Sequence, residues 1–209
     1  MKSNYFITIE GIEGVGKSTC LTYIQQYLQE THIDFVLTRE PGGTAVAEAI
    51  RQILLHHENE EMTHEAELLL MFAARSQHIA HVIRPALAAG QWVICDRFTD
   101  ASYAYQGGGR GMPESQIATL EEWVQGELRP DLTILLDAPV EFALNRAKGR
   151  SAPDRIENSG LAFFEQARKT YLARAKANPT RYHIIDATQS LEVVKAEIKE
   201  RLHMVLNKR

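Results

Sequence analysis

The sequence lacks the features that mark secreted, membrane-embedded or polyanion-binding proteins. Its 209 residues include two cysteines, Cys20 and Cys95, both in apolar surroundings, so we expect buried free thiols in a reducing compartment, with a disulfide as the alternative. No apolar run approaches the roughly 18 residues that a membrane span needs, and residues 1–10 lack the apolar core of a secretory signal. The formal net charge of -4 gives no general attraction for nucleic acids or anionic membranes. We therefore expect a cytoplasmic protein without membrane or nucleic-acid partners.

The apolar pattern predicts a single α/β domain over residues 1–209. Short β-branched or aromatic runs alternate with longer helical patterns, which favours a parallel sheet built from βαβ units. Because these runs are almost continuously apolar, we expect helices on both faces of the sheet. The predicted strands are 6–10, 35–38, 92–95, 132–136 and 182–185. The predicted helices are 17–30, 45–57, 65–88, 113–127, 140–148, 161–177 and 191–207. The polar, basic segment 149–160 is interpreted as a mobile loop, with a plain solvated connector as the alternative.

A glycine-rich segment matches a phosphate-binding loop (P-loop) at every required position. Gly11-Ile-Glu-Gly-Val-Gly-Lys-Ser-Thr fits Gly-x-x-x-x-Gly-Lys-Ser/Thr and stands between a predicted strand and a predicted helix. Its glycines let backbone N–H groups point at phosphate oxygens, and the helix start adds positive potential. Lys17 would reach the β- and γ-phosphates, Ser18 would offer a hydroxyl to Mg²⁺, and Thr19 would bond the α-phosphate. The predicted triphosphate-binding residues are Gly11, Glu13, Gly14, Val15, Gly16, Lys17, Ser18 and Thr19.

The remaining sequence narrows the class of P-loop protein. An Asn-Lys-x-Asp motif that would read guanine is absent after the later strands, which argues against a GTPase switch. A large motor or transporter ATPase would need a longer chain. We therefore favour a small kinase with an acceptor site and a lid.

Two arginines directly follow predicted strands. Arg39 comes after the second strand, and Arg97 comes after the third, next to Asp96. Ligands of doubly wound sheets bind at the carboxyl ends of the strands, and arginine suits phosphate oxygens. A surface ion pair is the alternative for either arginine taken alone. Asp96 occupies the usual position of an acidic residue that helps to hold Mg²⁺.

Six segments, in this order and spacing, resemble the thymidylate kinase (dTMP kinase) family of the bacterial type. The segments are Gly11-Ile-Glu-Gly-Val-Gly-Lys-Ser-Thr, Thr38-Arg-Glu-Pro-Gly-Gly-Thr, Leu69-Leu-Met-Phe-Ala-Ala-Arg75, Asp96-Arg-Phe, Ser102-Tyr-Ala-Tyr-Gln-Gly-Gly-Gly-Arg110 and Asp154-Arg-Ile-Glu157. The resemblance implies a P-loop NTPase-type three-layer sandwich, with a five-stranded parallel sheet of order 2-3-1-4-5 and a lid. It also implies a homodimer that converts dTMP to dTDP with ATP and Mg²⁺.

The resemblance assigns roles at the acceptor phosphate and base. Arg97 and Arg39 match residues that hold the dTMP phosphate. Phe72 matches a ring that stacks on thymine, although an apolar helix would also place it in the core. Arg75, on the same helical face, matches a donor to the base O4.

Further positions match contacts to the sugar. Tyr105 matches a ring that fills the space of a ribose 2′-hydroxyl, and Ser102 and Gln106 lie where the family contacts thymine and the sugar. Glu13 matches an acidic residue that reaches the 3′-hydroxyl or orients the phosphate-binding arginine.

A lid over residues 146–158 is expected to supply positive charge to the transferred group. Some family members carry this arginine in the P-loop, where the present sequence has Gly14. We therefore favour Arg150 and Arg155, with Arg146 as a further possibility. Direct in-line transfer without a covalent intermediate would then depend on positioning and charge neutralisation. The predicted catalytic residues are Glu13, Lys17, Arg97, Arg150 and Arg155.

Two other functions compete with this prediction. The first is a small-molecule P-loop kinase for another nucleoside monophosphate or metabolite, against which Phe72, Arg75 and Tyr105 argue. The second is a non-enzymatic nucleotide switch, which the basic lid and the missing guanine motif disfavour.

Overall fold

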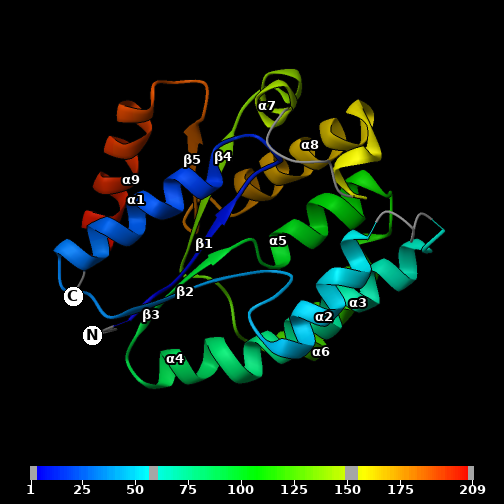
Figure 1. Ribbon diagram of the computed structural model, residues 1–209, viewed down its shortest axis with the longest axis horizontal. Coiled ribbons are helices and arrows are strands. Elements are labelled where there is room, and N and C mark those ends of the chain that lie inside the picture. Colours follow the sequence, from blue (N-terminus) through cyan, green and yellow to red (C-terminus); the bar gives the residue numbers. More distant parts are fainter. Residues whose placement is uncertain (1–3, 57–60, 149–154, 207–209) are drawn as a thin grey trace.

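Five parallel strands form one sheet in the computed structural model, which describes residues 4–56, 61–148 and 155–206 (Figure 1). The strands are β1 (Phe6–Glu10), β2 (Phe35–Arg39), β3 (Trp92–Asp96), β4 (Leu132–Asp137) and β5 (Tyr182–Asp186). Their order, β2-β3-β1-β4-β5, confirms the predicted order. All the strands after β1 run one residue further than predicted, to an arginine or aspartate, because backbone pairing such as Arg39 with Asp96 continues past the last apolar residue.

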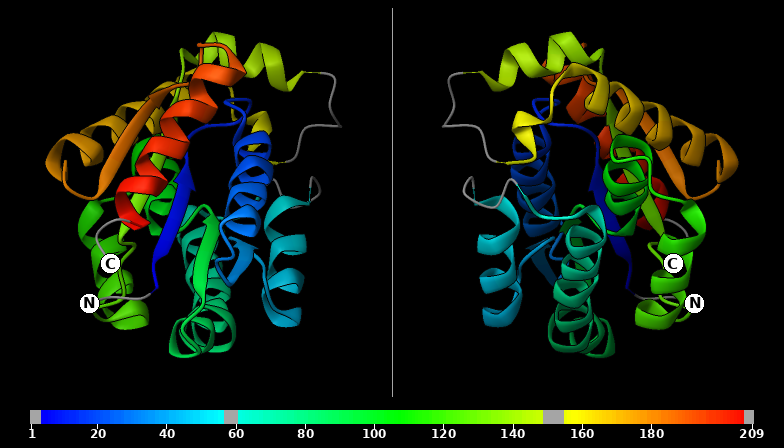
Figure 2. Two further views of the ribbon diagram at one scale, coloured as in Figure 1. Left: turned by 90° about the vertical axis from the view of Figure 1, so that its left-hand side faces the viewer. Right: turned by 90° about the vertical axis from the view of Figure 1, so that its right-hand side faces the viewer.

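Helices cover both faces of the sheet, which confirms the predicted three-layer arrangement. Figures 1 and 2 show α1 and α9 on one face, and η2, α4 and α8 on the other. The helical elements are α1 (Lys17–Glu30), α2 (Ala45–Leu55), α3 (His64–His78), η2 (Ile79–Ile83), α4 (Arg84–Ala88), α5 (Thr99–Ser102), η3 (Tyr103–Gly109), α6 (Glu114–Gln125), α7 (Val140–Ala147), η4 (Glu157–Ser159), α8 (Leu161–Ala177) and α9 (Leu191–Leu206). Within the described ranges, none of these helices has the length and apolar character to cross a membrane.

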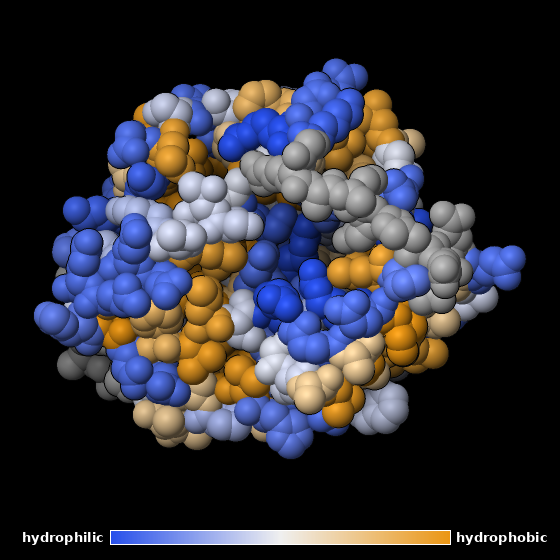
Figure 3. Space-filling view, in the orientation of Figure 1, coloured by the Kyte–Doolittle hydropathy of each residue, from blue (hydrophilic) through white to orange (hydrophobic). Residues whose placement is uncertain are grey.

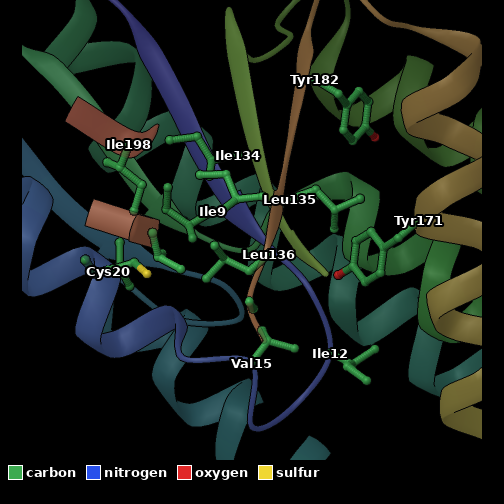
Figure 4. Packing of buried hydrophobic residues seen from close by; sticks show 14 of the residues in the cluster. Ile9, Ile12, Val15, Cys20, Ile134, Leu135, Leu136, Tyr171, Tyr182 and Ile198 are labelled. Carbon is green, nitrogen blue, oxygen red and sulfur yellow. The ribbon is translucent and has the colours of Figure 1, made fainter. Parts of the chain in front are cut away.

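Alternation along the central strand β1 decides which side chains face which layer. Ile7 and Ile9 join the apolar cluster that contains residues of α1 and α9, part of which is drawn in Figure 4. Phe6 packs on the opposite side, with residues of η2 and α4. Because side chains alternate along a strand, Glu10 points to the same side as Phe6 and lies buried under α8. Cys20 and Cys95 are buried free thiols, as expected.

The predicted helix 65–88 is present, but its middle has a wider turn. Residues Ile79–Ile83 are π-helical, and the Arg84 N–H donates to Ile79 O, five residues earlier. Pro85 follows at once in α4, where it has no N–H to continue the α-helical pattern. A π turn commonly absorbs such a mismatch within an otherwise continuous helix.

A helical segment after β3 lies outside the predicted elements. α5 continues into the π-helical η3, which includes Gly107, Gly108 and Gly109. Glycine runs normally disfavour helices. Here the missing side chains let α8 approach closely, since a Cβ at Gly108 would fall on Thr170 and one at Gly109 on the Phe163 ring. Tertiary packing therefore overrides the local preference.

The structure describes the predicted loop 149–160 from residue 155 onward. Residues 149–154 lie outside the described part of the chain. Arg155 and Ile156 are buried, and η4 follows them. The alternative of a solvated connector therefore does not hold for Arg155 and Ile156, because these two side chains pack against the domain.

Candidate active site

A cavity of about 330 Å³ opens at the carboxyl ends of β1, β2 and β3. Figure 3 shows a hollow in this view in which hydrophilic residues gather. Many of the predicted site residues line the cavity together, namely Glu13, Gly14, Lys17, Ser18, Arg75, Asp96, Arg97, Ser102, Tyr105 and Gln106. Residues that were predicted for two different substrates therefore share one cavity.

The P-loop connects β1 to α1 and leaves no room for a side chain at Gly14. This residue has a φ of 77°, and a Cβ there would fall on the backbone carbonyl of Ala143 in α7. An arginine at position 14 would therefore require α7 to move. The geometry agrees with the inference that the P-loop itself does not carry the arginine for the transferred phosphate.

Lys17 lies in the first turn of α1 and is half-buried. Its Nζ donates to Gly11 O at 3.0 Å and to Ile12 O at 2.8 Å. Withdrawal from water and the nearby Arg97 lower the pKa of Lys17 to about 8, against the opposing effect of Glu13 and Asp96. An anion bound in the P-loop would favour the charged ammonium group. The neighbouring Ser18 and Thr19 are exposed, whereas Val15 is buried.

Asp96 presents an oxygen suited to a cation or to its water shell. Its Oδ1 is buried and has no hydrogen-bond partner among the described residues, and Asp96 lines the cavity with Ser18. Within the same ranges, no group of three histidine, cysteine or acidic side chains converges to hold a metal alone. Such a donor set fits Mg²⁺, which proteins usually bind through one or two side chains together with phosphate oxygens.

Arg97 lines the cavity and contacts both the P-loop and Tyr105. Its Nη2 donates to Glu13 Oε1 at 2.7 Å, and its Nη1 donates to Gly11 O at 2.8 Å. The Tyr105 hydroxyl donates to the other oxygen of Glu13, also at 2.7 Å, and Arg97 lies 4.8 Å from the centre of the Tyr105 ring. Glu13 therefore orients both the arginine and the tyrosine.

Arg39 does not line the cavity. Its side chain is 53% exposed and pairs with Glu48 at 3.0 Å, so its predicted contact with the acceptor phosphate stays a prediction. Arg51 of α2 lines the cavity instead and donates to Pro41 O at 2.9 Å. Sequence reasoning missed Arg51, because it lies inside an amphipathic helix without a surrounding motif.

Arg75 is fixed by three partners and keeps one donor for a ligand. Its Nε donates to Glu40 at 2.7 Å, and its Nη2 donates to Phe98 O at 3.2 Å and to Ser102 Oγ at 3.1 Å. Its Nη1 is buried without a partner among the described residues. A carbonyl oxygen in the cavity would satisfy this donor. Glu40 is held in turn by His78 at 2.9 Å.

Phe72 lies beneath Arg75 rather than in the cavity lining. It is 2% exposed, packs with Leu68, Tyr103 and Ile117, and lies 4.5 Å from the Arg75 guanidinium. The core alternative considered for this ring therefore describes its present packing. Stacking of Phe72 on a base stays a prediction.

Arg155 makes a buried ion pair and does not itself line the cavity, although its neighbour Ile156 does. Its Nη2 donates to Glu67 at 2.6 Å, and its Nε donates to Leu54 O at 2.8 Å. The same Glu67 accepts from Gln106 at 2.8 Å and from Arg110 at 3.2 Å, and these partners help to keep its pKa below the ordinary value despite burial. This geometry favours a structural role for Arg155 over the predicted catalytic one. Arg150 lies outside the described residues.

The lowered pKa of Lys17 predicts proton uptake when a triphosphate binds. We expect ATP binding at pH 8.5 to take up most of a proton, because the bound anion raises a pKa that starts at about 8. At pH 7 the same group is already protonated and contributes little. Calorimetry in buffers of different ionisation enthalpy measures the uptake. A Lys17→Arg variant, which keeps the charge but does not titrate, should lose it, and an unchanged uptake in that variant would contradict the assignment.

Comparisons with known proteins agree with this geometry. The family model described as thymidylate kinase matches residues 9–198. The chain is 56% identical over 204 residues to a thymidylate kinase of Pseudomonas savastanoi pv. phaseolicola, covering 98% of this chain and 97% of that protein. It is 58% identical over 196 residues to one of Pseudomonas putida (strain GB-1), covering 94% and 93%. A crystal structure of thymidylate kinase from Ehrlichia chaffeensis superposes with a TM-score of 0.78 at 34% identity, covering 96% of this chain and 98% of that chain. The chain therefore belongs to the thymidylate kinase family.

Proposed function

We propose that the protein transfers the γ-phosphoryl group of ATP to dTMP and so forms dTDP. Family membership makes it a phosphotransferase. The observation that carries the specific reaction is the single cavity that joins a P-loop lysine to the Arg97–Glu13–Tyr105 cluster and to the free donor of Arg75. One end of this cavity suits a triphosphate, and the other suits a nucleoside monophosphate.

The donor end would act through charge and positioning. Lys17 and the backbone N–H groups of the P-loop would hold the β- and γ-phosphates. Ser18 and Asp96 would hold Mg²⁺, which neutralises charge on those phosphates when bound. The dTMP phosphate already carries the attacking oxygen, so an in-line attack forms the new P–O bond while the bond to ADP breaks. No side chain has to form a covalent intermediate.

The acceptor end would read the phosphate, sugar and base separately. Arg97 would bind the dTMP phosphate, with Arg51 as a second cavity-lining arginine near it. Glu13 fixes Arg97 by an ion pair and fixes Tyr105 by a hydrogen bond, which keeps the ring in place against a 2′-hydroxyl. The unpaired Nη1 of Arg75 would donate to the base O4.

We further propose a cytoplasmic location and a lid that closes over the site. A lid over residues 146–158, carrying Arg150, would supply the remaining positive charge at the transferred group. The buried free thiols of Cys20 and Cys95 are compatible with a cytoplasmic enzyme.

We also propose a homodimer, on the basis of apolar side chains exposed on adjacent helices. Trp123 of α6 is 81% exposed, and Leu69 of α3, which packs beside α6, is also exposed. Val46 and Ile53 add exposed apolar surface on α2, the neighbour of α3. Exposed apolar surface of this kind marks interaction sites, and a second copy of the chain offers a matching surface by two-fold symmetry.

The proposed reaction predicts a strong preference for dTMP among monophosphates. With ATP and Mg²⁺, kcat/KM for dTMP should exceed that for dCMP by about 100-fold or more, because the 4-amino group of cytosine leaves the buried Arg75 donor unpaired. ADP release in a coupled assay measures the preference. Faster turnover of UMP, CMP or AMP than of dTMP would overturn the proposal.

We expect alanine substitutions of Arg150 and Arg155 to affect different properties, catalysis for Arg150 and stability for Arg155. Arg150→Ala should lower kcat by about 100-fold with little change in dTMP affinity, as for loss of a group that acts in the transition state. Arg155→Ala should lower the free energy of unfolding by about 3 kcal/mol, because it leaves Glu67 with a broken buried ion pair. Steady-state kinetics measures kcat and KM for dTMP, and urea denaturation measures the free energy of unfolding. An unchanged kcat in Arg150→Ala would exclude its catalytic role.

The proposed dimer predicts a specific effect of charge on α6. Trp123→Arg should convert the protein to a monomer at micromolar concentration, because the interface would have to bury a cation. Met204→Arg, on the exposed part of α9, is the matched control and should remain dimeric. Sedimentation equilibrium measures the mass. A monomeric wild type, or a Trp123→Arg dimer of unchanged stability, would contradict the proposal.

A further inference from the structure

Glu10 and Tyr171 form a buried pair beneath the acceptor end of the cavity. Glu10 is the last residue of β1, directly before the P-loop, and is 0% exposed. Tyr171 lies in α8 and is also buried. Figure 4 shows its ring extending from α8 toward the sheet, with the hydroxyl oxygen at the tip. The hydroxyl donates to Glu10 Oε2 at 2.7 Å. Neither residue was predicted as part of the site.

The other oxygen of Glu10 holds the backbone next to Arg97. Arg97 has a φ of 67°, a left-handed conformation that is strained for a residue with a side chain. Its own N–H donates to Ile9 O at 3.0 Å, and the following N–H, that of Phe98, donates to Glu10 Oε1 at 2.7 Å. Bonds to β1 therefore fix the peptides on both sides of Arg97. The surroundings hold a conformation that the residue would not adopt alone.

Tyr171 extends this support to the guanidinium. Arg97 Nη1 donates to Tyr171 Oη at 3.3 Å, in addition to its bond with Gly11 O. Tyr171 thus links Glu10 to the Arg97 head group, while Glu13 holds the other terminal nitrogen. The backbone and the side chain of Arg97 are both tied to the same buried carboxyl.

Burial favours the neutral carboxyl form of Glu10, which acts through hydrogen bonds and not through a negative charge. Burial and the nearby Asp100 raise the pKa of Glu10 to about 8, although Arg97 and the bonds from Tyr171 and Phe98 oppose the rise. A carboxyl and a phenol can each donate, so the contact with Tyr171 is possible in either protonation state.

We infer that Glu10 and Tyr171 are positioning residues for Arg97, which they hold in the left-handed conformation that directs its guanidinium into the acceptor end of the cavity. The inference rests on the proposed function, in which Arg97 binds the phosphate of dTMP. It adds two residues that do not themselves touch the substrate. In this arrangement β1 both leads into the P-loop and fixes the backbone on either side of Arg97.

The inference predicts a selective loss of phosphate recognition. Tyr171→Phe should raise KM for dTMP about tenfold, the usual effect of losing a hydrogen bond to a charged group. KM for ATP should stay within about twofold, and so should inhibition by thymidine, which lacks the phosphate that Arg97 would bind. Tyr103→Phe is the matched control, because it removes a buried tyrosine–glutamate bond, to Glu121 at 2.6 Å, that does not involve Arg97. It should leave KM for dTMP unchanged.

Variants at Glu10 test the same pair independently of Tyr171. Glu10→Gln keeps an acceptor for the Phe98 N–H and a donor for Tyr171, so KM for dTMP should stay within about threefold. Glu10→Met has similar length and removes both bonds, so KM for dTMP should rise by about tenfold or more. Thermal unfolding confirms that each variant is folded, and the Glu10 comparison decides if Tyr171→Phe does not fold.

Three results would overturn the inference. They are an unchanged KM for dTMP in folded Tyr171→Phe, an equal weakening of dTMP and thymidine binding, and equal damage from Glu10→Gln and Glu10→Met. Wild-type activity is a separate test. If the unaltered protein did not phosphorylate dTMP, the proposed function would fail, whereas an active wild type with insensitive variants would remove only the positioning role.

Discussion

The ion pair between Arg97 and Glu13 connects the two halves of the site. Glu13 belongs to the P-loop, and Arg97 follows the neighbouring strand, so a contact of 2.7 Å joins these two elements at the wall of the cavity. In-line transfer requires two reacting groups at a fixed separation. A direct bond between the elements that would hold them meets this requirement without a long chain of intervening contacts. Register between β1 and β3 sets the positions of both residues.

Three arginines near the cavity, Arg75, Arg97 and Arg155, are each paired with a carboxylate. Glu40 holds Arg75, which keeps one unpaired N–H, and Glu13 holds Arg97 at the cavity wall. Glu67 holds Arg155 with no such opening toward the cavity. A buried cation without a partner is costly, so pairing makes these side chains rigid before a ligand arrives. The remaining donors are then oriented in advance, which reduces the cost of ordering them on binding.

Sequence patterns were sufficient where the chemistry is local. The strands began where apolar runs began, and the P-loop lay in its expected place between β1 and α1. Sequence patterns were insufficient where a local conformation or a side-chain contact depends on segments far apart in the sequence. Glycines 107–109 became helical because α8 needs the space of their missing side chains. The family resemblance suggested a catalytic role for Arg155, but its contact with Glu67, 88 residues earlier, carries no sequence signal. Sequence patterns predicted a site role for Arg39 and none for Arg51, and only the folded chain shows that Arg51 lines the cavity.

The sequence by itself determined that a triphosphate-binding loop follows the first strand, that the domain is a parallel α/β sandwich, and which family the motifs resemble. These properties depend on the order and spacing of residues along a short stretch. Only the tertiary structure shows the contact between Glu10 and Tyr171, which lie 161 residues apart and carry no motif. The left-handed turn at Arg97 is likewise invisible in the sequence, because its stability depends on acceptors that β1 supplies. Hydrogen bonds between distant segments require the folded chain, and for that reason the conformation of Arg97 is a property of the fold.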